Sequence, residues 1–291
     1  MSTPFVQGVA SGAIRSGTSI LYGALGEVIV ERAGMVNLGL EGTMLIGACF
    51  GFIATVETGN AYLGLLAAAL AGGLFNLLFG YLAITRRANQ LAAGLTMMFF
   101  ALGLTAIMGK DYVGESIDGL PTMALPLLSE IRWVGPVLFT NDLLSYCMVP
   151  TAIGVWYLLY RTRWGLSVRT VGESRTSAFA AGLRPELIQY QALFVGGLLG
   201  GIGGAHLSLA YTGVWVEGMT NGRGFIAVAL VIFASWQPMR AILGALLFGG
   251  AVAFQLQLQA REVSISPFLL DMLPYLLTLA VLLLWGRNRQ H

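Results

Sequence analysis

RTRWGLSVRTVGESRTSAFAAGLRPELIQ, residues 161–189, is a polar and basic stretch in a chain that is apolar on both sides of it. It contains five arginines and two glutamates. Ser174 can cap a short helix over residues 175–181, about two turns long. Gly182 can end that helix, and Pro185 can begin the next one. The pattern predicts a small helix outside the membrane, held between two basic arms.

The composition of the whole chain is that of a membrane protein. Of its 291 residues, 56% are hydrophobic and 10% are charged, and the mean hydropathy is +0.76. A soluble domain carries about 25% charged residues. The apolar runs are long enough for spanning helices, and the alternating strands of a membrane barrel are absent. We therefore expect an all-α polytopic bundle of transmembrane helices, folded as one domain over residues 1–291.

About nine apolar segments are expected to cross the membrane: residues 5–29, 43–56, 61–84, 91–108, 143–160, 187–211, 225–236, 241–258 and 268–285. Segments 43–56 and 225–236 are short for a span unless neighbouring polar residues belong to them. Most arginines fall in loops on one side of such a bundle, which is then the cytoplasmic side. This places residues 161–186 and the C-terminus in the cytoplasm and leaves the side of the N-terminus open.

Two polar interruptions of the apolar pattern resemble each other. They are ERAGMVNLGLEG, residues 31–42, and TGVWVEGMTNGRG, residues 212–224. Each contains an apolar-Glu-Gly triplet and is followed by a short apolar segment. Unwound backbone at membrane depth is tolerated only where it is buried in protein or lines a wet cavity. The pattern favours two pseudo-symmetric halves with interrupted helices, and the alternative is two ordinary loops with coincidental Glu-Gly pairs.

Four polar residues in the interruptions and one aromatic residue are candidates for a solute path: Asn37, Glu41, Phe99, Glu217 and Asn221. The polar ones could hydrogen-bond a hydroxylated solute, and the aromatic ring could stack on a base or simply anchor its helix at the membrane interface. Carboxylates gather at segment ends instead of being spaced through the segments. This favours structural pairing, such as Glu31 with Arg32 or Arg15, over a proton relay.

The sequence contains no motif for catalysis or metal binding. HExxH, GxSxG and the phosphate-binding loop GxxxxGK[ST] are all absent. Cys49 and Cys147 lie in apolar segments without metal or redox spacing, and His206 is better interpreted as a hydrogen-bonded helix residue than as a ligand. No basic tract for nucleic acid is present. We expect no cofactor in this chain, and any ATP-driven role requires a partner that could dock on residues 161–189.

Several segments resemble a known family. LGEVIVERAGMVNLGLEGTMLIGA, residues 25–48, closely resembles the motif of permease subunits of bacterial ABC importers for nucleosides and simple sugars. This group is related to the ribose and branched-chain amino-acid permeases. The resemblance continues through residues 86–105, 126–146, 180–183, 221–238 and 269–282, and so covers nearly the whole chain.

The resemblance implies a type II importer permease whose loop 161–186 couples to an ATPase subunit. The coupling contacts that it implies are Ser174, Ala178, Phe179, Ala181 and Gly182. The alanines are small enough to enter a groove, and Phe179 offers an apolar anchor. The arginines could contact acidic groups of the ATPase or anionic lipid headgroups.

The resemblance also implies partners and a location. The partners are a cytoplasmic ABC ATPase that holds ATP and magnesium, a second permease that is usually a paralogue, and an extracytoplasmic solute-binding protein. The chain would lie in the bacterial inner (plasma) membrane, surrounded by lipid. Relatives often carry asparagine where this chain has Met98, so the resemblance leaves the identity of the solute undetermined. A nucleoside or purine-like compound is expected; a ribose-like sugar permease, or an ion-coupled transporter or channel, is the alternative.

Overall fold

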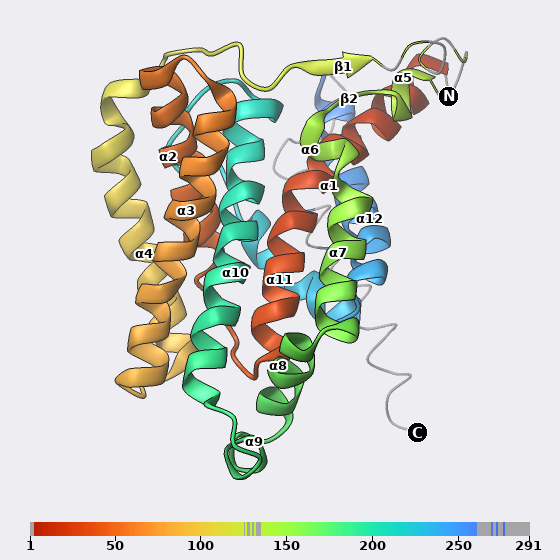
Figure 1. The fold of residues 1–291 in the computed structure, drawn as a ribbon. Helices are drawn as coiled ribbons and strands as arrows, with labels where there is room; N and C mark the ends of the chain where they lie inside the picture. Colours follow the sequence, from red (N-terminus) through yellow and green to blue (C-terminus); the bar gives the residue numbers. More distant parts are fainter. Residues whose placement is uncertain are drawn as a thin grey trace.

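In the computed structural model, the structure describes residues 3–124 and 135–260, together with residues 126, 129, 131, 269, 272 and 276. Within these residues the protein is a bundle of helices, as expected (Figure 1). The predicted segment 268–285 lies outside the described residues except for isolated positions, and so does the C-terminus.

The described part of the first half of the chain contains four long helices and a small sheet. The elements are α1 (Thr3–Arg32), α2 (Leu40–Thr58), α3 (Ala61–Gly80) continued by a π-helical turn (Tyr81–Thr85), α4 (Gln90–Gly109) continued by a 3-10 turn (Lys110–Tyr112), β1 (Thr122–Ala124), α5 (Gly135–Leu138), β2 (Thr140–Asp142) and α6 (Leu143–Tyr146). The two strands pair antiparallel, with Thr122 opposite Asp142.

Residues 148–260 contain six helices. They are α7 (Met148–Arg161), α8 (Arg163–Glu173), α9 (Arg175–Ala180), α10 (Pro185–His206) continued by a π-helical turn (Leu207–Tyr211), α11 (Arg223–Phe233) and α12 (Pro238–Gln259). Helices α8 and α9 lie at one end of the bundle, where α7 ends and α10 begins (Figure 1). We call this the arginine-rich end. The basic arm predicted before the short helix is itself a helix, α8, capped by the Thr162 side chain.

Among the described residues, five helices are long and apolar enough to cross a membrane: Leu40–Thr58, Ala61–Thr85, Gln90–Tyr112, Pro185–Tyr211 and Pro238–Gln259. Helix α1 is longer, with 30 residues, and α7 and α11 are shorter, with 14 and 11 residues. A multi-pass membrane protein is therefore supported. The count of nine segments and the pseudo-symmetry of two halves stay predictions.

The short second segment is longer in the structure than its apolar run. Helix α2 begins at Leu40 and has 19 residues, because the Leu40–Gly42 triplet of the first interruption is helical. The interruption itself is therefore confined to residues 33–39. Helix α11, in contrast, remains short, although it too begins inside its interruption, at Arg223.

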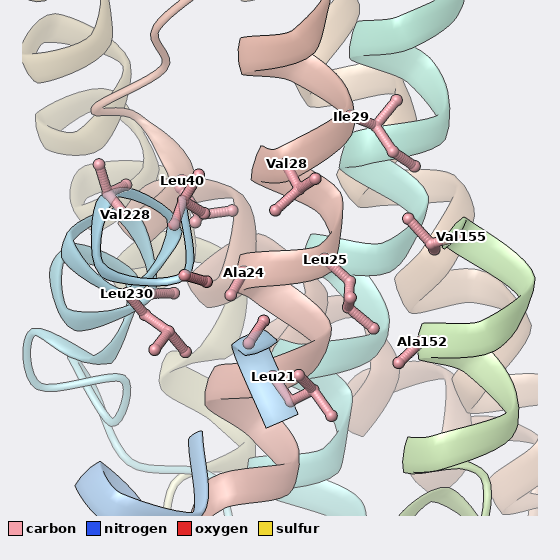
Figure 2. Close-up of a cluster of buried hydrophobic side chains, with 14 of the residues drawn as sticks. Leu21, Ala24, Leu25, Val28, Ile29, Leu40, Ala152, Val155, Val228 and Leu230 are labelled. Atoms are coloured by element: carbon pink, nitrogen blue, oxygen red, sulfur yellow. The ribbon is translucent and has the colours of Figure 1, made fainter. Parts of the chain in front are cut away.

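The core forms around α1, which packs against α10, α11 and α12. Figure 2 shows apolar side chains of α1, including Leu25 and Val28, beside Leu40 of α2, Val155 of α7 and Val228 of α11. Burying such a side chain contributes about 1.5–3 kcal/mol in water, but between helices in lipid close packing matters more. This buried centre holds the two interruptions near each other.

Glycines allow the helices around α10 to touch backbone to backbone. A Cβ added to Gly72 of α3 would overlap the carbonyl oxygen of Gly197 in α10, and one on Gly204 would overlap that of Met44 in α2. Close helix approach through small residues replaces the hydrophobic driving force that lipid cannot supply. Gly72 and Gly204 are therefore packing residues of the bundle.

Candidate functional site

The short helix α9 begins and ends as its sequence predicts. Ser174 Oγ accepts a hydrogen bond from the backbone N–H of Ser177 at 3.2 Å. At the other end, the N–H of Leu183 donates to the carbonyl of Ala178 at 3.1 Å, with Gly182 at a φ of +82°. This is a Schellman motif, which needs a left-handed residue at the position that Gly182 occupies. Two local motifs therefore fix α9.

Only part of the predicted contact set on α9 faces outward. The Phe179 side chain is 72% exposed, and Ala181 and Gly182 are exposed, whereas Ala178 is 0% exposed. Ala178 packs into the core of this chain, with Leu183 beside it. The expectation that Ala178 enters a partner's groove is therefore corrected. Successive helical residues point about 100° apart, so Ala178 and Phe179 lie on different faces of α9.

Phe179 lines an open groove of about 620 Å³ at the arginine-rich end. The other lining residues come from α9 and the start of α10: Arg175, Thr176, Arg184, Pro185, Glu186 and Leu187. Arg175 and Glu186 lie 3.9 Å apart and are both well exposed, so their attraction is weak. The groove thus combines an apolar anchor with arginines whose charge is available to a partner.

Helix α8 rests directly on the first interruption. A Cβ on Gly172 would overlap the carbonyl oxygen of Arg32, and one on Gly34 would lie 3.1 Å from the Cα of Gly172. In addition, Gln189 Nε2 donates to the buried carbonyl of Ala33 at 3.0 Å. The arginine-rich end is therefore in backbone contact with the segment where α1 stops.

The charges at the end of α1 are not paired as the sequence predicts. Glu31 accepts a hydrogen bond from the indole N–H of Trp236, and Arg32 donates to the hydroxyl of Tyr160 at 3.0 Å. The Arg32 guanidinium also lies 5.8 Å from the centre of the Tyr160 ring, a cation–π contact. Tyr160 of α7 and Trp236, which follows α11, thus replace the expected Glu31–Arg32 pair.

Asn37 is part of the framework inside the bundle. Its side-chain amide donates to Asn76 Oδ1 at 3.1 Å and accepts from the backbone N–H of Gly39 at 2.9 Å. Its own backbone N–H donates to Glu27 Oε1 at 2.9 Å. Because the residue is also fully buried, its polar atoms serve the turn between α1 and α2.

Glu41 joins the two interruptions. Its carboxylate accepts from the Thr220 hydroxyl at 2.6 Å, the Gly222 N–H at 2.8 Å and the Gly224 N–H at 2.6 Å. The side chain belongs to the first turn of α2, and all three donors belong to the second interruption. The sequence singles out both segments, but only the structure brings them into contact.

The remaining path candidates lie at the surface. Phe99 is 65% exposed on α4, and Glu217 and Asn221 are exposed in the second interruption. Asn221 has a left-handed backbone, with a φ of +45°. The five candidates therefore divide into two framework residues and three surface residues, and a solute contact by any of them stays a prediction.

A buried polar cluster that the sequence did not predict lies far from the arginine-rich end. Asp142 accepts from Ser145 Oγ at 2.7 Å and lies 3.4 Å from His206 Nε2, and Ser145 is 2.9 Å from Thr18 Oγ1. Burial raises the pKa of Asp142, but the hydrogen bonds from His206 and Ser145 outweigh it and hold the pKa below its ordinary value. The interpretation of His206 as a hydrogen-bonded helix residue is confirmed.

Comparison with known proteins gives these features a class. The long apolar helices are those of a multi-pass membrane protein. Residues 9–282 match a family model described as the permease component of branched-chain amino acid transport systems. The chain belongs to this family. The resemblance found in its sequence is therefore confirmed.

Three relatives cover most of the chain. It is 39% identical over 267 residues to a putative glucose ABC transporter permease of Haloferax volcanii, covering 90% of this chain and 81% of the relative. It is 34% identical over 277 residues to a guanosine ABC transporter permease of Bacillus subtilis, covering 90% and 87%. It is 33% identical over 285 residues to a nucleoside ABC transporter permease of Lactococcus lactis, covering 92% and 89%. Permease components are transport components and not enzymes, and the family in general implies an ATPase and a binding protein as partners.

Proposed function

We propose that this chain is the permease subunit of an ATP-driven ABC importer that carries a nucleoside or purine-like compound inward across the bacterial plasma membrane. The observation that carries the proposal is the capped helix α9 with its exposed Phe179. The chain has no phosphate-binding loop, so the energy comes from a separate subunit that binds ATP and magnesium. Relatives that transport nucleosides and guanosine by name support this solute class.

In this proposal α9 docks in a groove of the ATPase on the cytoplasmic side. Phe179 enters the groove, Ala181 and Gly182 allow the backbone to approach, and Ser174 keeps the helix wound. Arg175 and Arg184 orient the partner through its acidic groups. The C-terminus lies on the same side, in keeping with the preference of arginine for cytoplasmic loops.

The solute path is proposed to include Phe99, Glu217 and Asn221. All three are exposed in the single chain, so a second, paralogous permease is needed to enclose a path beside them. An aromatic ring and two hydrogen-bonding side chains suit a solute with a base and hydroxyl groups. The extracytoplasmic binding protein would deliver the solute at the end opposite α9.

A simple sugar is the second candidate solute. The relative with 39% identity is a putative glucose permease, and nucleosides and sugars share a hydroxylated ring.

The permease, its ATPase, second permease and binding protein should be expressed together in a host that lacks nucleoside uptake. We expect saturable, ATP-dependent uptake of labelled guanosine that excess adenosine reduces and excess glucose does not. Uptake of glucose or ribose alone would exclude the nucleoside, and gradient-driven uptake by the purified chain alone would exclude an ABC permease.

A further inference from the structure

We infer that Glu41 is a positioning residue that ties α2 to the start of α11, so that the two interruptions move as one unit during transport. This role replaces the solute contact that the sequence suggested for it. The inference rests on the transport function proposed above, but the structural tie can be tested without any solute. It is carried by the geometry around one buried carboxylate.

The donors to Glu41 are groups that have no partner inside α11. The first N–H groups of a helix lack intrahelical acceptors and attract negative charge. Gly222 is the N-cap of α11 and makes no side-chain capping bond, and the Gly222 and Gly224 N–H groups both donate to Glu41. A residue about 180 positions earlier in the chain therefore caps α11 in place of a local Ser, Thr or Asp.

The backbone around the tie leaves no room for a side chain at Gly224. A Cβ on Gly224 would lie 2.6 Å from the backbone nitrogen of Glu41 and closer still to its Cα. Gly222 holds a φ of +80°, a conformation that other residues rarely adopt. The α2 and α11 ends thus touch directly, and Leu40 and Val228 of the same two helices share one apolar cluster (Figure 2).

The occupancy of the carboxylate argues against a solute contact. Oε1 accepts two hydrogen bonds and Oε2 accepts one, all at 2.6–2.8 Å. The residue is only 8% exposed. Hydrogen bonds to a charged acceptor are about twice as strong as neutral ones. A solute that took these acceptor positions would leave buried N–H groups of α11 without partners, at a large cost.

The tie is linked through neighbouring contacts to the arginine-rich end. Helix α8 touches Arg32 and Gly34 at the start of the first interruption, through Gly172. At the other end of α11, Trp236 binds Glu31 and Arg32 through its indole and its carbonyl group. Helices α1, α2 and α11 are therefore linked to one another by contacts, α8 touches this group at Arg32 and Gly34, and Glu41 supplies a charged link between the two interruptions.

The test is amide hydrogen exchange of the purified protein in lipid nanodiscs, read on peptides that cover residues 220–226. Glu41→Gln keeps the side-chain volume but replaces an acceptor oxygen by an NH2 group that faces N–H donors. We expect exchange in this peptide to become at least about tenfold faster, the equivalent of one lost charge-assisted hydrogen bond. Glu57→Gln, the same change at the exposed far end of α2, is the matched control and should leave the peptide unchanged.

Transport kinetics then separate a tie from a solute contact. Glu41→Gln should lower the maximal uptake rate at least about tenfold with an unchanged half-saturating concentration, and Thr220→Val, a milder variant that removes one donor, should lower it less. Unchanged exchange in Glu41→Gln would overturn the tie, as would an effect on half-saturation alone. If Glu41→Gln does not fold, the same readouts on Thr220→Val decide. A wrong solute assignment would leave the exchange result intact, so the two failures are distinguishable.

Discussion

Phe179→Ala should weaken binding of the ATPase without destabilising the permease. Burying a whole phenylalanine side chain is worth about 1.5–3 kcal/mol, and 72% of this one is exposed before docking. Completing its burial in a partner's groove is then worth about 1–2 kcal/mol, or about 5- to 30-fold in affinity. Because only a small part of the Phe179 side chain is buried in the free permease, Phe179→Ala should change its free energy of unfolding by less than about 1 kcal/mol.

The assay is titration of the purified ATPase subunit onto the permease in nanodiscs, followed by fluorescence, with thermal unfolding of each variant in parallel. The matched control is Leu243→Ala, because Leu243 on α12 is 70% exposed and lies away from α9 in the chain. We expect the control to bind the ATPase like the parent protein. Equal affinities for Phe179→Ala and the parent, with α9 intact, would refute the assignment of α9 as the coupling helix.

Three further substitutions test other parts of the structure. Gly182→Ala should lower the free energy of unfolding by about 1 kcal/mol, measured by thermal unfolding. The cause is the φ of +82°, since no atom lies within 4 Å of the added Cβ. Gly182→Asn should lower the free energy of unfolding less. Gly204→Ala should prevent a monodisperse preparation in size-exclusion chromatography, since its Cβ overlaps the Met44 carbonyl, whereas Gly154→Ala, with open space around it, should not. Asp142→Asn should lower the melting temperature near neutral pH. Folding lowers the pKa of Asp142 from 3.8. The charged carboxylate therefore stabilises the fold above about pH 4, and this stabilisation fades as the pH falls below that value. Melting temperatures of the two proteins should therefore converge on acidification, and a constant difference would contradict the role of the charge.

Much of the fold can be predicted from local sequence patterns. The apolar runs gave most helices to within a few residues, since a membrane span needs a long uninterrupted apolar segment. The bounds of α9 followed from Ser174, Gly182 and Pro185, because caps act through bonds to groups a few residues away. Helix α8 was missed because its polar composition matches a solvated loop as well as an amphipathic surface helix.

The site was less accessible to sequence reasoning because its contacts are long-range. A helix of about two turns has too few residues for its inward face to be read from periodicity, and so Ala178 was assigned outward. Glu41 was recognised as unusual, but an isolated carboxylate in an apolar chain fits a solute contact as well as a structural acceptor. Nothing local distinguishes the two roles.

The sequence by itself determined that this is a membrane permease, where most of its long apolar helices run and how α9 is capped, since hydropathy, caps and family motifs are properties of neighbouring residues. The tertiary structure decided what the polar interruptions do. It placed the Glu41 carboxylate on the Thr220 hydroxyl and the Gly222 and Gly224 N–H groups, and it set α8 on the end of α1. These contacts join residues more than a hundred positions apart, and only packing of the whole bundle brings them within hydrogen-bond distance.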